Sequence, residues 1–299
     1  MKESFSVSGF YRWSNPDHLP ERAFDEFAAA GTRFLSVDAD TTKTLSVQKG
    51  KMARLCAKAE SAGLIFRDAH APWGPGNDLN EITTEDRFSY HETTLAILGD
   101  HGIRTCTYHI GASCIYEDQS WFGNEEKYRS IAAKALERLL KTAEKYKIVL
   151  CVENCFEPST TAQEAMGLVK RVSSPYTGLC FDCGHANLME PMEKRDVSQM
   201  VCYIKKAWEP GIPDFTEKIA EFMMPEIVTV HVHDNDGLND CHALPEDGGT
   251  VNWERINNVL AKVPRLISLQ SEISTDSIEN PIKAIPKIVS ALGNLWKFG

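Results

Sequence analysis

The chain has 299 residues and a net charge of −10, a length that suits one large α/β domain. The acidic balance gives no electrostatic footprint for nucleic acid, although a bound metal would still allow a small anionic substrate. No stretch approaches the roughly 20 apolar residues of a membrane span, and the first eight residues lack the apolar region of a signal peptide. We therefore expect no membrane contact and a cytoplasmic location.

Short apolar segments alternate with amphipathic segments along the chain, which is typical of a parallel sheet covered by helices. Eight such pairs predict an α/β fold of the (β/α)8 TIM barrel type, with a single domain over residues 1–299. The predicted strands span 5–10, 33–37, 64–70, 103–109, 148–153, 177–182, 227–233 and 266–272. The predicted helices span 19–30, 49–62, 84–101, 124–146, 161–172, 197–208 with 215–223, 253–260 and 281–295.

Six consecutive predicted strands, the third to the eighth, end in side chains that bind metals or transfer protons. These side chains are His70, His109, Glu153, Asp182 with His185 beyond it, His231 with His233, and Glu272. The carboxyl ends of all strands in a parallel barrel lie at the same face. The long connections 71–83, 110–123 and 234–252 follow strands and so lie at this face too. The sequence therefore predicts a metal site there.

Four of these strand ends are predicted to converge as metal ligands: Glu153, Asp182, His233 and Glu272. Three carboxylates close together repel one another unless a cation joins them. The oxygen majority suits Mn²⁺ or Mg²⁺, and the imidazole also admits Zn²⁺ or Co²⁺. The alternative is that each carboxylate caps a helix or forms an ion pair.

His231 and His233 lie on the same face of their predicted strand, because side chains alternate with a period of two. We favour His233 as the ligand because it is nearer the carboxyl end of the strand. His231 is then expected one layer below, hydrogen-bonded and structural. His185 is expected to bind a substrate oxygen or a further metal, or else to be a hydrogen-bonded loop histidine.

The loop after the seventh strand contains Asp240 and His242, which are candidate metal ligands or phosphate contacts unless the loop is simply solvated. Trp73, near His70, and the pair Trp121-Phe122 are candidates to wall a pocket for the apolar face of a sugar. Plain packing is an equally good interpretation of these aromatic residues.

The nine cysteines lie mostly in apolar segments, which suits small buried side chains in a reducing compartment. Cys180 and Cys183 have the CxxC spacing of redox or structural zinc sites. No second pair follows them, and Asp182 between them gives a better reason for the segment.

Over nearly its whole length the chain resembles the xylose isomerase-like TIM-barrel superfamily. This superfamily includes sugar-phosphate isomerases and epimerases, ketose 3-epimerases, hydroxypyruvate isomerase, inosose dehydratase and endonuclease IV. The resemblance implies that Glu153, Asp182, His233 and Glu272 are metal ligands and that His185 is on the substrate side. The matching segments are His70-Ala71-Pro72, Val152-Glu153-Asn154, Asp182-x-x-His185, His231-x-His233-x-x-Asp236, Asp240-x-His242 and Glu272.

The leading hypothesis is a divalent-metal-dependent isomerase or epimerase of a sugar, sugar phosphate or inositol-type polyol. The metal would stabilise an enediolate, with Glu153 and Glu272 as the catalytic pair on opposite sides of the reacting carbon. His185 and Glu157 would hold substrate hydroxyl groups, with His70, Trp73 and His242 around them.

Three alternatives remain open at this point. An endonuclease IV-like phosphoesterase would hold up to three Zn²⁺, with His70, His109, His185, Asp240 and His242 as additional ligands. The acidic composition and the acidic 243–249 segment argue against gripping DNA. A related dehydratase or lyase uses the same metal, and a non-catalytic sugar-binding subunit is the third. Substrate identity, native metal and oligomeric state, a homo-oligomer included, stay open.

Overall fold

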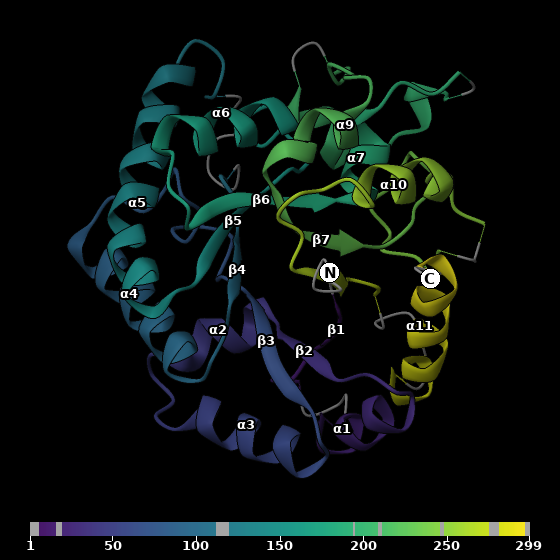
Figure 1. Ribbon diagram of the computed structural model, residues 1–299. Coiled ribbons are helices and arrows are strands. Elements are labelled where there is room, and N and C mark those ends of the chain that lie inside the picture. Colours follow the sequence, from purple (N-terminus) through teal and green to yellow (C-terminus); the bar gives the residue numbers. More distant parts are fainter. Residues whose placement is uncertain are drawn as a thin grey trace.

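Eight parallel strands close into a barrel in the computed structural model and follow one another around it in chain order (Figure 1). The structure describes residues 6–15, 20–111, 120–193, 195–208, 211–245, 248–274 and 281–296. Ser6 pairs with Ser268, so the first strand closes onto the last. The predicted (β/α)8 barrel is therefore confirmed. The strands are β1 (Ser6–Tyr11), β2 (Phe34–Val37), β3 (Ile65–His70), β4 (Thr105–Tyr108), β5 (Val149–Glu153), β6 (Thr177–Asp182), β7 (Ile227–Val232) and β8 (Ser268–Ser271).

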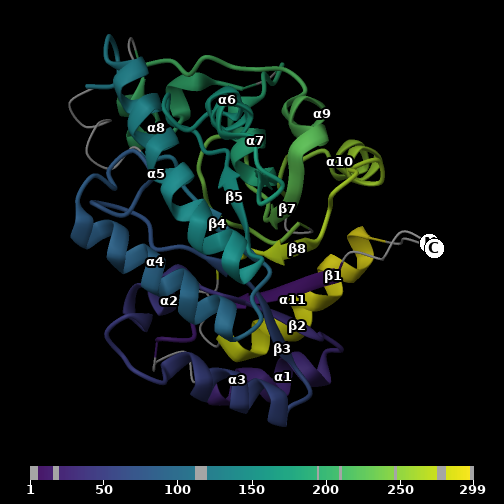
Figure 2. The ribbon, with the colours of Figure 1, turned by 60° about the vertical axis from the view of Figure 1, so that its left-hand side comes forward.

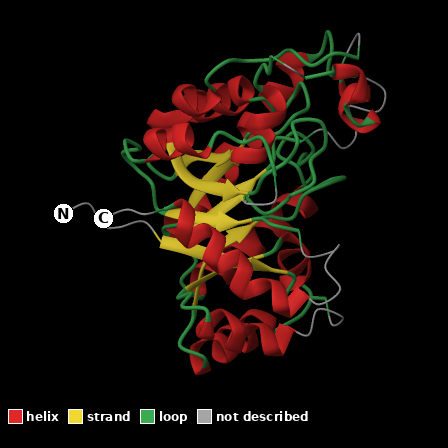
Figure 3. Ribbon diagram, turned by 90° about the vertical axis from the view of Figure 1, so that its right-hand side faces the viewer, coloured by secondary structure: helices red, strands yellow, loops and turns green. Residues whose placement is uncertain are grey.

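Helices cover the outside of the barrel, and the strand arrows lie side by side within them (Figure 3). α4 packs beside α5, and α11 packs beside α1 (Figure 2). The α-helices are α1 (Pro20–Ala29), α2 (Ala39–Leu45), α3 (Lys51–Ser61), α4 (Glu85–Asp100), α5 (Glu125–Tyr146), α6 (Ala162–Val172), α7 (Cys183–Met189), α8 (Cys202–Ala207), α9 (Ile219–Met223), α10 (Trp253–Leu260) and α11 (Pro281–Leu295). Two 3-10 helices are η2 (Val197–Gln199) and η3 (Met224–Glu226).

The strands are buried on both faces, as expected for a parallel sheet between a filled interior and a helical layer. Every residue of β6 and β7 is buried. The helices bury one face each: α5 places Leu136, Leu139 and Ala143 against the barrel and leaves its charged residues outside. This two-layer burial fixes the strand ends, and therefore the site, on a rigid frame.

The barrel interior carries a polar cluster around Asp68, at the level where β4 and β8 begin. Asp68 Oδ1 accepts hydrogen bonds from Thr105 (2.6 Å) and Ser268 (3.0 Å). Asp68 Oδ2 accepts from Ser8 and from Arg67, whose Nη2 lies 3.2 Å away. The carboxylate is fully buried, and both of its oxygens have donors, which buried charges require.

Among the described residues, the α-helices α2 and α7 and the 3-10 helix η3 were not predicted, and α2 and α7 begin within two residues of the end of a strand. The predicted helix 197–208 is divided into η2 and α8, and α9 begins at Ile219 rather than at residue 215. β4 ends at Tyr108, so His109 follows the strand instead of ending it. Residue 5 of the first predicted strand lies outside the described residues. None of the described helices combines the length and apolar character needed to cross a membrane.

Candidate metal centre

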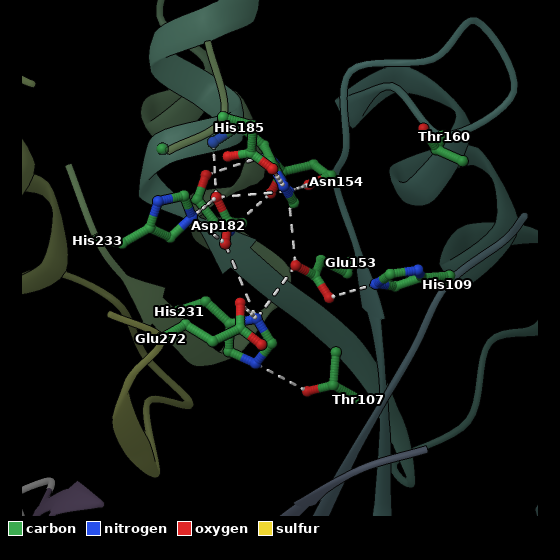
Figure 4. Close-up of polar contacts among 12 residues, drawn as sticks. Thr107, His109, Glu153, Asn154, Thr160, Asp182, His185, His231, His233 and Glu272 are labelled. Atoms are coloured by element: carbon green, nitrogen blue, oxygen red, sulfur yellow. Dashed lines mark hydrogen bonds and ion pairs between the residues drawn. The ribbon is translucent and has the colours of Figure 1, made fainter. Parts of the chain in front are cut away.

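The last residues of β5 and β6 converge with His231 of β7 and Glu272, which follows β8 (Figure 4). One ligand atom from each of these four side chains lies within 4.8 Å of the others. His231 Nδ1 is 3.1 Å from Glu153 Oε1, 3.1 Å from Glu272 Oε2 and 3.8 Å from Asp182 Oδ2. Three carboxylates and one imidazole form a donor set that fits a hard or borderline divalent cation.

Positive charge from neighbouring imidazoles favours the ionised forms of Glu153 and Glu272. Burial opposes ionisation of Glu153, but the facing imidazoles of His231 and His109 hold its pKa well below the usual range. Burial likewise opposes ionisation of Glu272, and His231 lowers the pKa of that carboxyl to about 2. Burial alone would lower the pKa of His231, yet Glu272 and Glu153 raise it well above the usual range. A divalent cation bound between these groups would supply the same positive charge.

Neighbouring side chains hold the four residues in place. The side chain of Asn154 accepts a hydrogen bond from the backbone N–H of Asp182 at 2.9 Å and donates one to the Asp182 carbonyl at 3.2 Å. These two hydrogen bonds join the ends of β5 and β6. Asp182 also caps α7, because its Oδ1 accepts the backbone N–H of His185 at 2.6 Å. Thr107 Oγ1 lies 3.4 Å from His231 Nε2, so Nδ1 of that ring faces the carboxylates.

A second group of histidines faces the other oxygen of Glu153. His70 Nε2 and His109 Nε2 lie 3.3 Å and 3.2 Å from Glu153 Oε2. Within the described part of the chain, this buried oxygen has no hydrogen-bond partner of normal geometry. Glu153 therefore presents one oxygen to His231 and the other to a space lined by two imidazoles.

A third group lies on the other side of Asp182. His185, His233, Asp240 and His242 place one ligand atom each within 4.8 Å of one another. Asp240 Oδ2 is 3.2 Å from His185 Nε2 and 3.3 Å from His242 Nε2. Burial would lower the pKa of His242, but its contact with Asp240 raises it to about 9. The rings of His233 and His242 are stacked, with centroids 3.8 Å apart.

A cavity of about 390 Å³ is lined by members of all three groups: Glu153, Glu272, His70, His109, His185, Asp240 and His242. A second cavity of about 340 Å³ extends toward β1 and β2, past Arg12 and Asp38. Both volumes suit a monosaccharide-sized ligand. The residues that border both cavities are Trp73, Asp240, His242 and Glu272.

Comparison with known proteins gives the same architecture. Residues 24–290 match the family described as the xylose isomerase-like TIM barrel. The chain belongs to this family. The strand-end donors described above are therefore at the carboxyl face of a xylose isomerase-like barrel.

Solved structures of xylose isomerase-like barrels superpose on almost the whole chain. A D-psicose 3-epimerase from Clostridium cellulolyticum H10 with D-tagatose is 14% identical, with a TM-score of 0.65 over 97% of this chain and 98% of that one. The 3-keto-D-glucoside 4-epimerase YcjR from E. coli is 14% identical, with a TM-score of 0.69 over 98% and 99%. A xylose isomerase-like protein from Mycobacterium smegmatis in complex with magnesium is 14% identical, with a TM-score of 0.66 over 98% of each chain. At such identities the likeness shows the fold.

Among curated proteins, the uncharacterized protein y4fM of Sinorhizobium fredii (strain NBRC 101917 / NGR234) is 28% identical over 109 residues. The matched segment is 36% of this chain and 27% of that protein. The chain thus spans about a quarter of the length of this relative.

The structure places His231 and His233 in different groups of possible metal ligands. His231, expected one layer below the site, lies in the four-residue group with the three carboxylates, and His233 lies in the third group. β7 ends at Val232, so His233 has left the barrel wall, and its Nε2 lies 3.0 Å from both Asp182 oxygens. Gly184 makes this position available, because a Cβ there would lie 2.0 Å from the His233 ring.

The other predicted site residues are at the same face of the barrel. Glu157 borders the larger cavity, and its Oε2 accepts a hydrogen bond from Thr160 at 2.7 Å. Trp73 is half exposed, and its ring centroid lies 5.7 Å from that of His109. Trp121 does not wall this space: it borders a separate cavity between α5 and α6.

Two features of the site were missed or left open by the sequence. Asp234 is buried, pairs with Ala243 in an isolated bridge, and accepts hydrogen bonds from Val251 N and Trp253 Nε1, so it holds the loop that carries Asp240 and His242. Its position directly after His233 was the available signal.

Within the 243–249 segment, residues 246–247 lie outside the described residues. The CxxC cysteines are both buried, Cys180 against Cys151 and Val228 and Cys183 in the main core.

Proposed function

We propose that this protein is a divalent-metal-dependent isomerase or epimerase of a sugar or a related polyol, with or without a phosphate group. The observation that carries the proposal is the convergence of Glu153, Asp182, His231 and Glu272 at the carboxyl face of the barrel. His231 replaces His233 in the proposed ligand set. Similarity in fold to sugar epimerases supports the same reaction class.

A cation held by these four side chains would polarise adjacent carbonyl and hydroxyl oxygens of the substrate and stabilise the negative charge of an enediolate. Glu153 and Glu272 are the proposed acid-base pair. One carboxylate removes the proton from the carbon beside the carbonyl, and the other returns a proton to the opposite side of that carbon. If only one carboxylate acts, it returns the proton on the same face to the neighbouring carbon, the former carbonyl carbon. The hydroxyl proton of the first carbon moves to the other oxygen, and the product is the aldose-ketose isomer.

The remaining predicted residues are proposed to position the substrate. His185 and Glu157 border the larger cavity, where each is in a position to bind a hydroxyl group. Trp73 presents a half-exposed ring for the apolar face of a sugar, and His70 and His242 complete the walls.

The test is solvent deuterium exchange by the metal-loaded protein in D₂O over a panel of ketoses, their phosphates and inosose-type polyols. Removal and return of a carbon-bound proton should place deuterium beside the carbonyl and generate an epimer or isomer. A product that has lost a water molecule relative to the substrate would instead indicate the related dehydratase. No exchange across the panel, with metal bound at the four residues, would contradict the proposal.

A second candidate, a multi-zinc phosphoesterase, is favoured by one observation. The histidine groups around Glu153 Oε2 and around Asp240 provide donors for further metal ions. Water activated between clustered ions would then attack a phosphodiester. Elemental analysis giving two or three zinc ions per chain, with cleavage of an abasic-site duplex, would favour this candidate over the isomerase.

A further inference from the structure

The two cavities at the carboxyl face meet at one of the proposed catalytic carboxylates. Glu272 borders both of them, together with Trp73, Asp240 and His242, whereas Glu153 lines the larger cavity. Each cavity has the volume for one monosaccharide. A sugar in the larger cavity, with its reacting carbon between Glu153 and Glu272, would therefore leave the second cavity for another part of the substrate.

The second cavity is lined by side chains that suit hydroxyl groups. Arg12, directly after β1, has N–H donors, and the mostly exposed carboxylate of Asp40 has acceptors. Asp38 serves the fold instead, because its oxygens accept hydrogen bonds from Thr41 N (3.0 Å), Thr41 Oγ1 (2.6 Å) and Trp13 N (3.2 Å). Since a sugar hydroxyl both donates and accepts, a second sugar ring can use Arg12 and Asp40 together.

The charge around the two cavities disfavours a phosphate group on the substrate. Among the described residues that border them, Arg12 is the one Lys or Arg side chain. The imidazoles of His185 and His242 both contact Asp240, at 3.2 and 3.3 Å, and are engaged there. A dianionic phosphate would be placed among seven carboxylates and repelled by them. These carboxylates belong to Asp38, Asp40, Asp78, Glu153, Glu157, Asp240 and Glu272.

We propose that the substrate is an uncharged glycoside of two sugar rings, with the reacting sugar in the larger cavity and the second ring beside Arg12 and Asp40. Trp73 would lie where the rings join, because its half-exposed side chain borders both cavities. Lys43 Nζ lies 5.0 Å from the Trp73 ring centroid and helps to hold the ring. The inference rests on the proposed function for the place of the reacting sugar. Arg12 and Asp40 then determine specificity, and the glycosidic bond is neither made nor broken.

Calorimetric titration of the Mg²⁺-loaded full-length protein tests this substrate class. The probes are D-fructose, D-fructose 6-phosphate and the four glucosyl-fructose disaccharides linked through O3, O4, O5 or O6 of fructose. Each disaccharide combines a ketose with a neutral second ring, and the four linkages direct that ring differently. At least one disaccharide should bind tighter than fructose by a factor of about 10, because hydrogen bonds to the charged groups of Arg12 and Asp40 are added. The phosphate should bind no tighter than fructose.

C241W and C202W are the matched pair of variants. Cys241 and Cys202 are both exposed, but Cys241 borders the second cavity and Cys202 borders neither cavity. The indole introduced by C241W should fill part of the second cavity and lower the ratio of the fructose Kd to the disaccharide Kd to about one. C202W should keep the wild-type ratio. If C241W fails to fold, R12M replaces it, since loss of the guanidinium should lower the same ratio.

Three results would overturn the two-ring substrate. They are the absence of any disaccharide that binds tighter than fructose, a preference that survives the loss of the second cavity in C241W or of Arg12 in R12M, and tightest binding by fructose 6-phosphate.

The outcomes also separate this proposal from the proposed function. Deuterium exchange into a monosaccharide, without any preference for a disaccharide, leaves the isomerase and removes the two-ring substrate. A disaccharide preference that C241W abolishes, without exchange into any sugar tested, leaves the two-ring site and removes the isomerase.

Discussion

The barrel interior holds two buried carboxylate clusters, and they are built differently. Near the start of β4, a single carboxylate, Asp68, faces an Arg and three hydroxyl groups, and both of its oxygens accept hydrogen bonds. At the carboxyl face, three carboxylates crowd around His231, and Glu153 Oε2 and Asp240 Oδ1 have no hydrogen-bond partner among the described residues.

The difference separates a cluster that serves the fold from the cluster that we propose to bind a cation. A buried charge that serves only the fold is matched by donors from its own chain, as Asp68 is. The upper cluster leaves two buried carboxylate oxygens without a hydrogen-bond partner among the described residues, and it lines a cavity of about 390 Å³. This arrangement supports the proposal that a divalent cation binds there.

The largest expected effect is on turnover. E153Q and E272Q should each lower kcat by about 10²–10⁴-fold or more, because each removes a proposed acid-base group and one ligand oxygen charge. Stopped or continuous assays on the substrate found by deuterium exchange measure this loss. D68N, at the other cluster, should keep kcat within a few-fold of the wild type in the folded protein.

Measuring the metal content of E153Q and E272Q distinguishes a loss of proton transfer from a loss of the bound cation. A variant that binds the cation and fails to turn over has lost the proton transfer itself. Near wild-type turnover in either variant would contradict the two-carboxylate mechanism. The difference between the two clusters would then not be a difference in catalytic role.

The second-largest effect is on the free energy of unfolding. Here the substitution at the Asp68 cluster should have the larger effect and the substitution at the carboxyl face the smaller. D68N should lower the free energy of unfolding by about 3–5 kcal/mol, because Arg67 and Ser8 then face an amide in place of a carboxylate. D182N should change it by less than about 1 kcal/mol without metal, since Asn still caps α7 and one of three like charges is removed. Urea unfolding in EDTA measures both. An equal loss in the two variants would show that the clusters do not differ as described.

Much of the fold was predictable because barrel strands are continuous apolar runs and the covering helices are amphipathic. The predicted bounds of β6, α10 and α11 agree with the structure. α2 and α7 were missed because each has only seven residues and is rich in small or Thr side chains, which gives no apolar periodicity. Their caps, Asp38 and Asp182, were the available signals.

The site was predictable as a set of strand ends but not in its layers. A period of two places His231 and His233 on the same face and does not tell which one faces the carboxylates. That choice depends on where β7 ends and on the space left by Gly184, which belong to tertiary structure.

A third buried group sharpens the comparison through pH. His91 of α4 is fully buried, with Nδ1 3.5 Å from Tyr108 Oη, and burial lowers its pKa to about 4, with Arg87 adding to the shift. The folded state therefore disfavours the protonated form of His91. Protonation of His91 does not affect the free energy of unfolding above about pH 6.5, and it lowers that free energy by about 3 kcal/mol as the pH falls toward 4. Tyr90 also contacts this ring.

H91Q removes this term and leaves every other titrating group in place. The difference in unfolding free energy between wild type and H91Q, followed by urea unfolding from pH 7 to pH 4, should change by about 3 kcal/mol in favour of the variant. Parallel pH profiles would mean that burial does not lower the pKa of His91 in the folded protein.

The smallest expected effect is the change in unfolding free energy when the metal is removed. This change shows which residues hold the cation. A cation that binds only the folded chain stabilises it by about 2.7 kcal/mol at a free concentration 100 times its Kd. Chelation should therefore lower the unfolding free energy of the wild type and of D68N by this amount, and leave D182N unchanged. A shift that persists in D182N would place the cation away from Glu153, Asp182, His231 and Glu272. If D240N then removes the shift, the cation lies in the group around Asp240, and the unpaired Asp240 Oδ1 rather than Glu153 marks the principal metal site.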